Sequence, residues 1–381
     1  MITTIDDSTN GFRLDLIRMA LSSSDASAIS LSQATLALSA FHLGRAEEAL
    51  KHKVRAIKSL SESFRTDKAS KPTQLAACLM LCVYSVFDAT DTTWNVHLQG
   101  AKTITGALTK REHEMSCFEF ISPWFEYHDT LSGYSLPAHL PEVEHRAPNI
   151  ILPECDRENR KVSFGSQARS LLLSLRLIDS LKIVGPLGCS TELLRLTACI
   201  NQLRLMQECS RCNSPQDGPK FLELSLLIGA RLQLLKQEIH VIVGESTGTI
   251  DHQRITLTAE FYRIATLLYL YQIAPEKAIP EKAVQNLVRD GLQLMDQMNP
   301  CTSPWPLFII ACNVTSDDER LRILTILNAM IQKRRIGNYR IIKGLIQTLW
   351  KQQDLAADEV VPKKIDWRNL IDPNSCMPSF I

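Results

Sequence analysis

Hydrophobic residues along the chain follow a helical period nearly throughout. Apolar side chains recur every three or four positions in 46–64, 94–108, 320–331 and 339–350, which is typical of amphipathic helices. In the first of these segments the apolar positions are Ala46, Ala49, Leu50, Val54, Ile57, Leu60 and Phe64, and the polar side carries Lys51, Lys53, Arg55 and Lys58. Strand-like alternation is scarce, and only 240–243 has a β-branched character. The pattern predicts an all-α fold of about a dozen or more packed helices without a significant sheet.

Helix start signals agree with this pattern. Ser316 and Glu319 are spaced as a capping box ahead of an apolar run. Proline is well suited to the first turn of a helix, because that turn needs no backbone N–H donor there. We therefore expect helices to begin near Pro72 and just after Ser303, at Pro304.

Residues 31–60 resemble a single tetratricopeptide unit. Units of that kind repeat every 34 residues or so. Moving that far from Gly44 leads to Cys78, in a stretch with no matching pattern. The segment is predicted to be an isolated α-hairpin.

The chain reads as a single helical unit with a few breaks, although its 381 residues would also allow roughly two to three domains. The longest irregular segment is 136–165, which contains four prolines, and shorter breaks fall at 211–219 and 244–251. We assign one domain to 10–370 and a tail to 371–381.

Composition and charge restrict the kind of partner. Hydrophobic residues make up 45% of the chain, enough for a sizeable core, and 42 basic residues balance 41 acidic ones to a net charge of +1. Such a balance does not favour binding to nucleic acid or to anionic lipid, so we expect no direct sequence-specific DNA binding and no membrane association. The basic run 333–335 is interpreted as a solvated helix end, with a nuclear-import or contact patch as the alternative.

Cysteine usage and the N-terminus indicate the compartment. The 11 cysteines are an odd number spread along the chain, and the first ten residues are polar and acidic without an apolar core. Both features favour reduced thiols in the nucleus or cytoplasm over a secreted, disulfide-bonded protein.

One segment has the pattern of a catalytic serine motif. Residues 244–248 read Gly-Glu-Ser-Thr-Gly, which fits the G-x-S-x-G turn that presents a nucleophilic serine above a parallel sheet. That arrangement needs a histidine base later in the chain, and the only later histidine is His252. Since a parallel sheet is not predicted either, we interpret 244–248 as a polar loop between helices.

The candidate metal ligands are too few for a site. Cys209 and Cys212 form one CxxC pair without a second pair at structural-zinc spacing. Cys78 and Cys82 lie among apolar residues, where free cysteine behaves as a small hydrophobic residue. The acidic pair 317–318 suits the first turn of a helix. We therefore predict no metal, no cofactor and no catalytic residue, and the sequence favours a role other than catalysis.

Two segments combine aromatic residues with histidine. Trp94, His97 and Gly100 are spaced to lie near one helix face, as are Trp124 and His128. We favour buried, hydrogen-bonded histidines beside a close helix crossing at the glycine over a ligand-binding or catalytic role.

Several segments, taken in order, resemble the fungal-specific transcription factor domain, the helical regulatory part of zinc-cluster transcription factors. They are 10–13, 19–23, 36–43, 49–60, 79–84, 94–101, 127–129, 305–312, Asn338, 349–350 and 366–368. The resemblance spans about residues 10 to 370 and implies a regulatory, nuclear protein with dimerisation and small-molecule sensing. The resemblance implies that full-length members carry an N-terminal zinc cluster of six cysteines, whereas the first cysteine here is Cys78. We therefore expect no zinc-cluster DNA-binding domain.

The resulting hypothesis is a transcription-regulator-like protein that consists of the helical regulatory domain. It would act through protein partners, as a homodimer or heterodimer, or through a small-molecule effector, and would control a metabolic or biosynthetic gene set. The alternative is the same scaffold reused as an enzyme or small-molecule-binding protein in a secondary-metabolite pathway. A plain scaffold protein is a third alternative.

Overall fold

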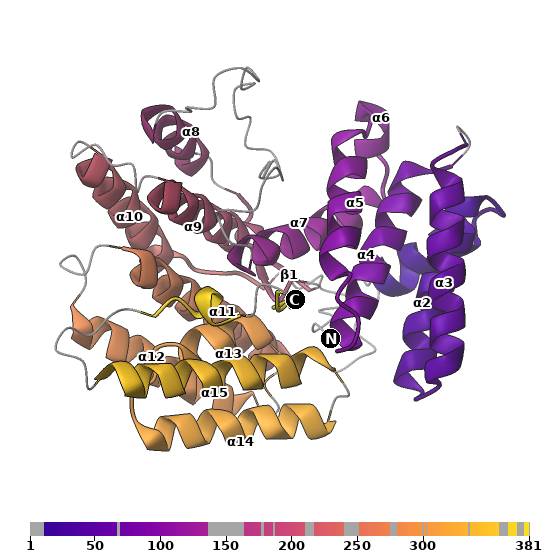
Figure 1. Ribbon diagram of the computed structural model, residues 1–381. Coiled ribbons are helices and arrows are strands. Elements are labelled where there is room, and N and C mark those ends of the chain that lie inside the picture. Colours follow the sequence, from indigo (N-terminus) through magenta and orange to yellow (C-terminus); the bar gives the residue numbers. More distant parts are fainter. Residues whose placement is uncertain are drawn as a thin grey trace.

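The structure is a computed structural model, and it describes residues 11–66, 69–135, 164–176, 179–185, 187–209, 217–239, 251–274, 280–298, 301, 303–333, 336–357, 365–371 and 377–380. Within these residues the predicted all-α fold is confirmed (Figure 1). The only strands there are β1 (Ile183–Val184) and β2 (Cys189–Ser190), an antiparallel pair two residues long.

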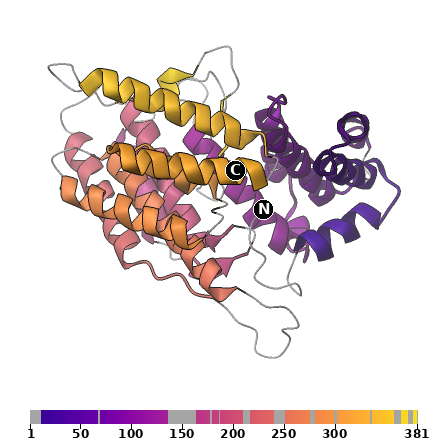
Figure 2. The same cartoon turned by 90° about the horizontal axis from the view of Figure 1, so that it is seen from below.

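The N-terminal helices gather on one side of the molecule in both views (Figures 1 and 2). They are the π-helical turn η2 (Phe12–Leu16), α1 (Ile17–Leu21), α2 (Ala26–His42), α3 (Ala46–Ser63), α4 (Lys71–Phe87), α5 (Trp94–Gly106) and α6 (Lys110–His113). Helix α2 packs against both α3 and α4, and α4 packs against α5.

Helices α2 and α3 form the predicted α-hairpin. The turn between them depends on Gly44, which has a φ of 74°, a left-handed value that a residue with a Cβ adopts at a cost. The N–H of Gly44 donates to the carbonyl of Phe41 at 3.0 Å, and the N–H of Arg45 donates to the carbonyl of Ala40 at 2.9 Å. This Schellman pair of hydrogen bonds closes α2 and reverses the chain.

Helix α7 (Phe118–Ser135) runs from these helices to the rest of the molecule. It contacts α4 and α5 on one side and α9 on the other. The second group comprises α8 (Phe164–Arg176), α9 (Thr191–Cys209), α10 (Asp217–Leu234), α11 (His252–Ile273), α12 (Glu281–Gln297), α13 (Pro304–Ala311), α14 (Asp317–Lys333), α15 (Asn338–Ala357) and the 3-10 turn η5 (Trp367–Leu370). Helix α7 is buried on nearly all sides because both groups pack on it.

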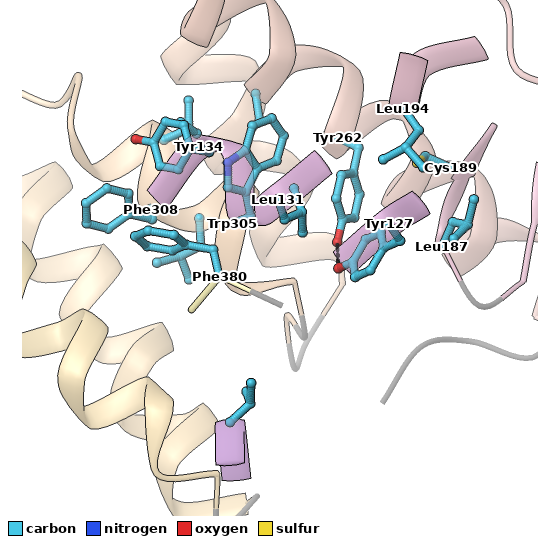
Figure 3. Close-up of a cluster of buried hydrophobic side chains, with 14 of the residues drawn as sticks. Tyr127, Leu131, Tyr134, Leu187, Cys189, Leu194, Tyr262, Trp305, Phe308 and Phe380 are labelled. Atoms are coloured by element: carbon cyan, nitrogen blue, oxygen red, sulfur yellow. Dashed lines mark hydrogen bonds between the residues drawn. The ribbon is translucent and has the colours of Figure 1, made fainter. Parts of the chain in front are cut away.

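An aromatic cluster fills the centre of the second group (Figure 3). The Tyr134 ring of α7 lies 5.9 Å from Trp305, 5.4 Å from Trp367 and 5.3 Å from Phe380, measured between centroids. Arg368 lies over the Tyr134 and Trp367 rings and donates to the Tyr134 carbonyl, so its charge is compensated where it enters the cluster. Two of the segments that carry the family resemblance, 305–312 and 366–368, therefore pack side by side.

The segment set apart as a tail takes part in this core. Of residues 371–381, those from 377 to 380 are described together with 371, and Phe380 is fully buried. The Trp94 indole N–H donates to the carbonyl of Met377 at 2.9 Å, and the side chain of Asn338 donates to the carbonyl of Ser379.

The helix start signals are confirmed. Ser316 and Glu319 make both reciprocal capping contacts, at 3.5 and 3.3 Å, ahead of α14. Pro72 lies in the first turn of α4, and Pro304 opens α13 directly after Ser303. The α14 start also takes the acidic pair 317–318 into its first turn.

Helix α3 buries a different side from the one that its apolar pattern predicts. Its bounds agree with 46–64, but its buried residues are Ala49, Ala56, Leu60 and Ser63. The larger apolar residues Leu50, Val54, Ile57 and Phe64 are exposed. Small side chains let α3 approach α2 closely, so close that the Ser30 hydroxyl donates to the Ala56 carbonyl at 2.9 Å.

Candidate functional site

A cavity of about 460 Å³ lies between the N-terminal helices and the second group. Its N-terminal wall is formed by η2, α1, α2 and α4 and includes Phe12, Leu16, Ile17, Ala20, Leu21, Leu36, Leu38, Met80, Val83, Val86 and Phe87. The opposite wall includes Trp124, Tyr127 and His128 of α7, Leu187, Gly188, Thr258, Tyr262, Ser303, Pro304, Ile336 and Tyr339. The volume is within the usual range for small-molecule pockets.

Charge is scarce at this cavity. Its described lining contains no Asp, Glu, Lys or Arg side chain. The hydroxyls of Thr35 and Ser39 on α2 donate to carbonyls of their own helix, at 2.9 Å each, as does Thr258 of α11 at 2.8 Å. The lining is therefore suited to an uncharged, largely apolar molecule.

A tyrosine pair provides the main polar feature of the far wall. The hydroxyls of Tyr127 (α7) and Tyr262 (α11) point toward each other and are 2.8 Å apart, as the dashed line in Figure 3 shows. Burial raises the pKa of both phenols, so they stay neutral at physiological pH. A neutral hydroxyl pair can exchange its mutual hydrogen bond for one to a ligand hydroxyl or carbonyl.

A buried cysteine lies beside His128 without lining the cavity itself. The Nδ1 of His128 lies 3.7 Å from the Sγ of Cys82 on α4, and both residues are buried. Burial lowers the pKa of His128 to about 3 and raises the pKa of the Cys82 thiol well above its usual value. A reactive thiolate paired with an imidazolium needs the opposite shifts, so this pair does not form an activated nucleophile.

The Trp94 segment lies outside the cavity lining. Trp94 is buried on α5, and the His97 Nε2 is 3.3 Å from the Thr93 hydroxyl. Burial lowers the pKa of His97 to about 4. A Cβ built on Gly100 would meet the Cys78 Sγ at 3.5 Å, an ordinary van der Waals distance, so the crossing is less tight than the sequence suggested.

Trp124 and His128 are in a different position, because both line the cavity. Their spacing predicts buried structural residues, and in the structure they also line the cavity. Tyr262 was not identified from the sequence. It is 135 residues from Tyr127, and no local pattern connects the two.

The remaining candidates can be placed only in part. Residues 240–250, which contain the G-x-S-x-G pattern, lie outside the described residues, as do Cys212 and the side chain of Cys209. So do residues 334–335 of the basic run and 136–163 of the long irregular segment. Within the described ranges, no group of three or more His, Cys, Asp or Glu is arranged to hold a metal ion. In those ranges no helix combines the length and apolarity that crossing a bilayer requires.

Comparison with known proteins gives two matches of nearly full length. The model of the family described as fungal specific transcription factor domain matches residues 1–380. The transcription factor iacI of Pestalotiopsis fici is 23% identical over 389 residues, covering 100% of this chain and 91% of that protein. No solved structure matches the chain.

Proposed function

Because the chain belongs to the fungal specific transcription factor domain family, we propose that it is a transcription regulator whose cavity binds a small-molecule effector. The effector is uncharged and mostly apolar, with a hydroxyl or carbonyl that hydrogen-bonds to the Tyr127–Tyr262 pair. The protein acts in the nucleus. Effector binding there changes its contacts with protein partners, and these control a metabolic or biosynthetic gene set.

The observation that carries this proposal is the position of the cavity. One wall comes from residues 12–42 and 80–87, and the other from α7, α11 and residues 303–339. A molecule in the cavity would touch both helix groups at once. Because a ligand shifts an equilibrium by its differential affinity for two states, a ligand that contacts both groups is able to favour one arrangement of them.

The chemistry of the wall supports binding over catalysis. His128 of the wall and Cys82 beside it are both held neutral by burial, and burial raises the pKa values of the Tyr127 and Tyr262 phenols. A general base near neutral pH would need a pKa close to the working pH. These four residues therefore do not supply the general base that the alternative, an enzyme in a secondary-metabolite pathway, would need.

The test compares two valine variants. Val83 on α4 lines the cavity, whereas Val96 on α5 is largely exposed. Val83→Phe adds a ring to the cavity and should exclude the effector, whereas Val96→Phe adds the same ring in solvent. The wild type and both variants are expressed and purified natively from the producing fungus, extracted with organic solvent and analysed by mass spectrometry. Transcripts are measured in strains carrying each form.

We expect one small apolar compound from the wild type and from Val96→Phe, and a loss of at least about tenfold in its recovery from Val83→Phe. A tenfold change corresponds to about 1.4 kcal/mol of binding free energy, which one added ring in a filled pocket readily exceeds. Transcript levels should change with Val83→Phe alone. Equal recovery from both variants, or a lost compound with unchanged transcripts, would contradict the proposal.

A further inference from the structure

His128 of α7 is a buried histidine in the wall of the cavity. Its imidazole ring lies edge-to-face against the rings of Trp124 and Tyr127, with centroids 6.0 and 5.9 Å away, and all three side chains line the cavity. Burial lowers the pKa of His128 to about 3, so the ring is neutral at physiological pH. A neutral imidazole has one nitrogen that donates a hydrogen bond and one that accepts.

Cys82 determines which of the two nitrogens is the donor. The Nδ1 of His128 lies 3.7 Å from the Cys82 Sγ. Burial raises the pKa of this thiol well above its usual value, so the sulfur keeps its proton. A thiol sulfur is only a weak acceptor, whereas an unprotonated imidazole nitrogen is a good one. The Cys82 S–H therefore donates to Nδ1, and the ring proton of His128 is on Nε2.

The Nε2–H of His128 is a buried donor that lacks a protein acceptor. Within the part of the chain that the structure describes, no group accepts a hydrogen bond from it. A buried donor without an acceptor costs free energy, and native proteins keep few of them. Because His128 lines the cavity, a molecule bound there is able to supply the missing acceptor.

The tyrosine pair adds a second donor next to the first. The hydroxyls of Tyr127 and Tyr262 face each other at 2.8 Å (Figure 3), so one O–H donates to the other oxygen and the second O–H stays available. A carbonyl oxygen has two lone pairs and no proton, so it accepts from both donors. A hydroxyl would bring a further proton that itself needs an acceptor. A carboxylate is disfavoured, because the described lining has no Lys or Arg side chain to compensate a buried negative charge.

We propose that His128 recognises a carbonyl oxygen of the effector through its Nε2–H, and that the effector is an uncharged ketone, ester, lactone or amide. This assignment rests on the proposed function, since it requires that the cavity bind a small molecule. His128 is then a residue that determines specificity. It selects against molecules that place a hydrocarbon group or an N–H donor at this end of the cavity.

The experiment uses three fluorescent naphthalene probes that differ at one position. Prodan is an uncharged, mostly apolar ketone; its reduced form has a hydroxyl in place of the carbonyl, and its deoxygenated form has a methylene group there. Fluorescence titration gives the dissociation constant of each probe for the wild type, His128→Phe and His52→Phe. Phenylalanine keeps a ring and removes the donor. His52 is the matched control, because it lies on α3, which contributes no residue to the cavity lining.

We expect the wild type and His52→Phe to bind the ketone at least about tenfold more tightly than the deoxygenated probe, with the alcohol between them. His128→Phe should lose about tenfold of its affinity for the ketone and keep its affinity for the deoxygenated probe within about threefold. The emission of a naphthalene ketone moves to longer wavelength when its carbonyl accepts a hydrogen bond. Bound prodan should therefore emit at a shorter wavelength in His128→Phe than in the wild type. Circular dichroism establishes that all variants are folded.

The proposal is overturned if His128→Phe binds the ketone as tightly as the wild type does, or if it weakens the ketone and the deoxygenated probe equally. It is also overturned if the wild type binds the alcohol or the deoxygenated probe as tightly as the ketone, since the carbonyl is then not what His128 recognises.

Val83→Phe separates these outcomes from a failure of the proposed function. Filling the cavity with the added ring should exclude all three probes. If Val83→Phe excludes them while His128→Phe does not discriminate among them, the carbonyl assignment fails and the cavity remains a binding site. If the probes bind Val83→Phe as they bind the wild type, or if the wild type binds none of them, the result counts against both proposals.

Discussion

Asp91 is the centre of a buried polar network, and its removal should cost more than that of any exposed acid nearby. Its carboxylate accepts hydrogen bonds from the Ser85 hydroxyl at 2.7 Å and from the backbone N–H of Thr93 at 2.9 Å, and it pairs with Lys53 at 2.5 Å. The perturbation is Asp91→Ala. The control is Asp88→Ala, three residues earlier in the same loop, where the carboxylate accepts from the N–H and hydroxyl of Thr90.

The magnitude follows from the groups left behind. Breaking a buried ion pair by removing one partner costs about 3–5 kcal/mol, and a lost hydrogen bond to a charged group about 1.5–3 kcal/mol. Since Lys53 is partly exposed and can recover water, we expect Asp91→Ala to reduce the free energy of unfolding by about 2–4 kcal/mol at pH 7. Asp88→Ala should cost less than about 1 kcal/mol, because its hydrogen bonds are local and near solvent.

The pH dependence gives an independent check. Burial by itself would raise the pKa of Asp91, but the hydrogen bonds from Lys53, Thr93 and Ser85 outweigh it and lower the pKa to about 2. A carboxyl with a lowered folded-state pKa contributes stability above its unfolded pKa, here 3.8, and loses that contribution as pH falls toward 2. The difference in stability between wild type and Asp91→Ala should therefore shrink below pH 4, by about 1–2 kcal/mol at pH 2 to 3 after allowance for solvent screening.

The assay is urea unfolding followed by circular dichroism at 222 nm, at pH 7, pH 5 and pH 3. The result that would refute the reasoning is a cost for Asp91→Ala no larger than that for Asp88→Ala. A cost that is the same at pH 7 and pH 3 would show that the charge of Asp91 is not what the network depends on.

Three further predictions use the same unfolding assay. Trp94→Ala should lower the free energy of unfolding by about 3–5 kcal/mol, because it leaves a cavity and removes the hydrogen bond to the Met377 carbonyl. Trp94→Phe should lower it by about half as much, and equal losses would count against the packing argument. His97→Gln should cost less than about 1 kcal/mol at pH 7. Because burial lowers the pKa of His97 to about 4, the variant should also lose less stability than the wild type as pH falls from 6.5 to 4, and an unchanged acid profile would contradict this. Phe380→Ala should cost about 3–5 kcal/mol because its ring is fully buried against Tyr134, and a cost below about 1 kcal/mol would contradict that placement.

The helices themselves could be predicted closely from the sequence. The 3.6-residue period placed a helix at 46–64, and α3 spans Ala46–Ser63; the period at 94–108 corresponds to α5 at Trp94–Gly106. Caps and first-turn prolines act within a few residues, so they too could be recognised locally.

Which face of a helix is buried was harder to predict. Periodicity shows which positions share a face but not what covers that face. In α3 the buried side is made of Ala49, Ala56 and Ser63, whose small side chains carry little hydrophobic signal. These small side chains allow α3 to pack closely on α2, and that contact exists only after the hairpin has formed.

The cavity could not be predicted for a similar reason. Tyr127 and Tyr262 meet only because α7 and α11 pack together, and each tyrosine lies in a helix that is apolar on several sides. The sequence pointed to Trp124 and His128 through their spacing, but it contained no sign that a space would remain beside them.

The position of Met377 to Phe380 has a consequence for how the protein is made. Ribosomes release the chain from its N-terminus onward, and helices that pack locally, such as α2 with α3, can form during synthesis. The aromatic cluster around Tyr134 must wait, because Phe380 is one of its buried members. Until then the nascent protein exposes aromatic surface that chaperones would bind. A nonsense codon at position 377 would remove Phe380 from this cluster, and we expect the truncated product to fold poorly and to be degraded.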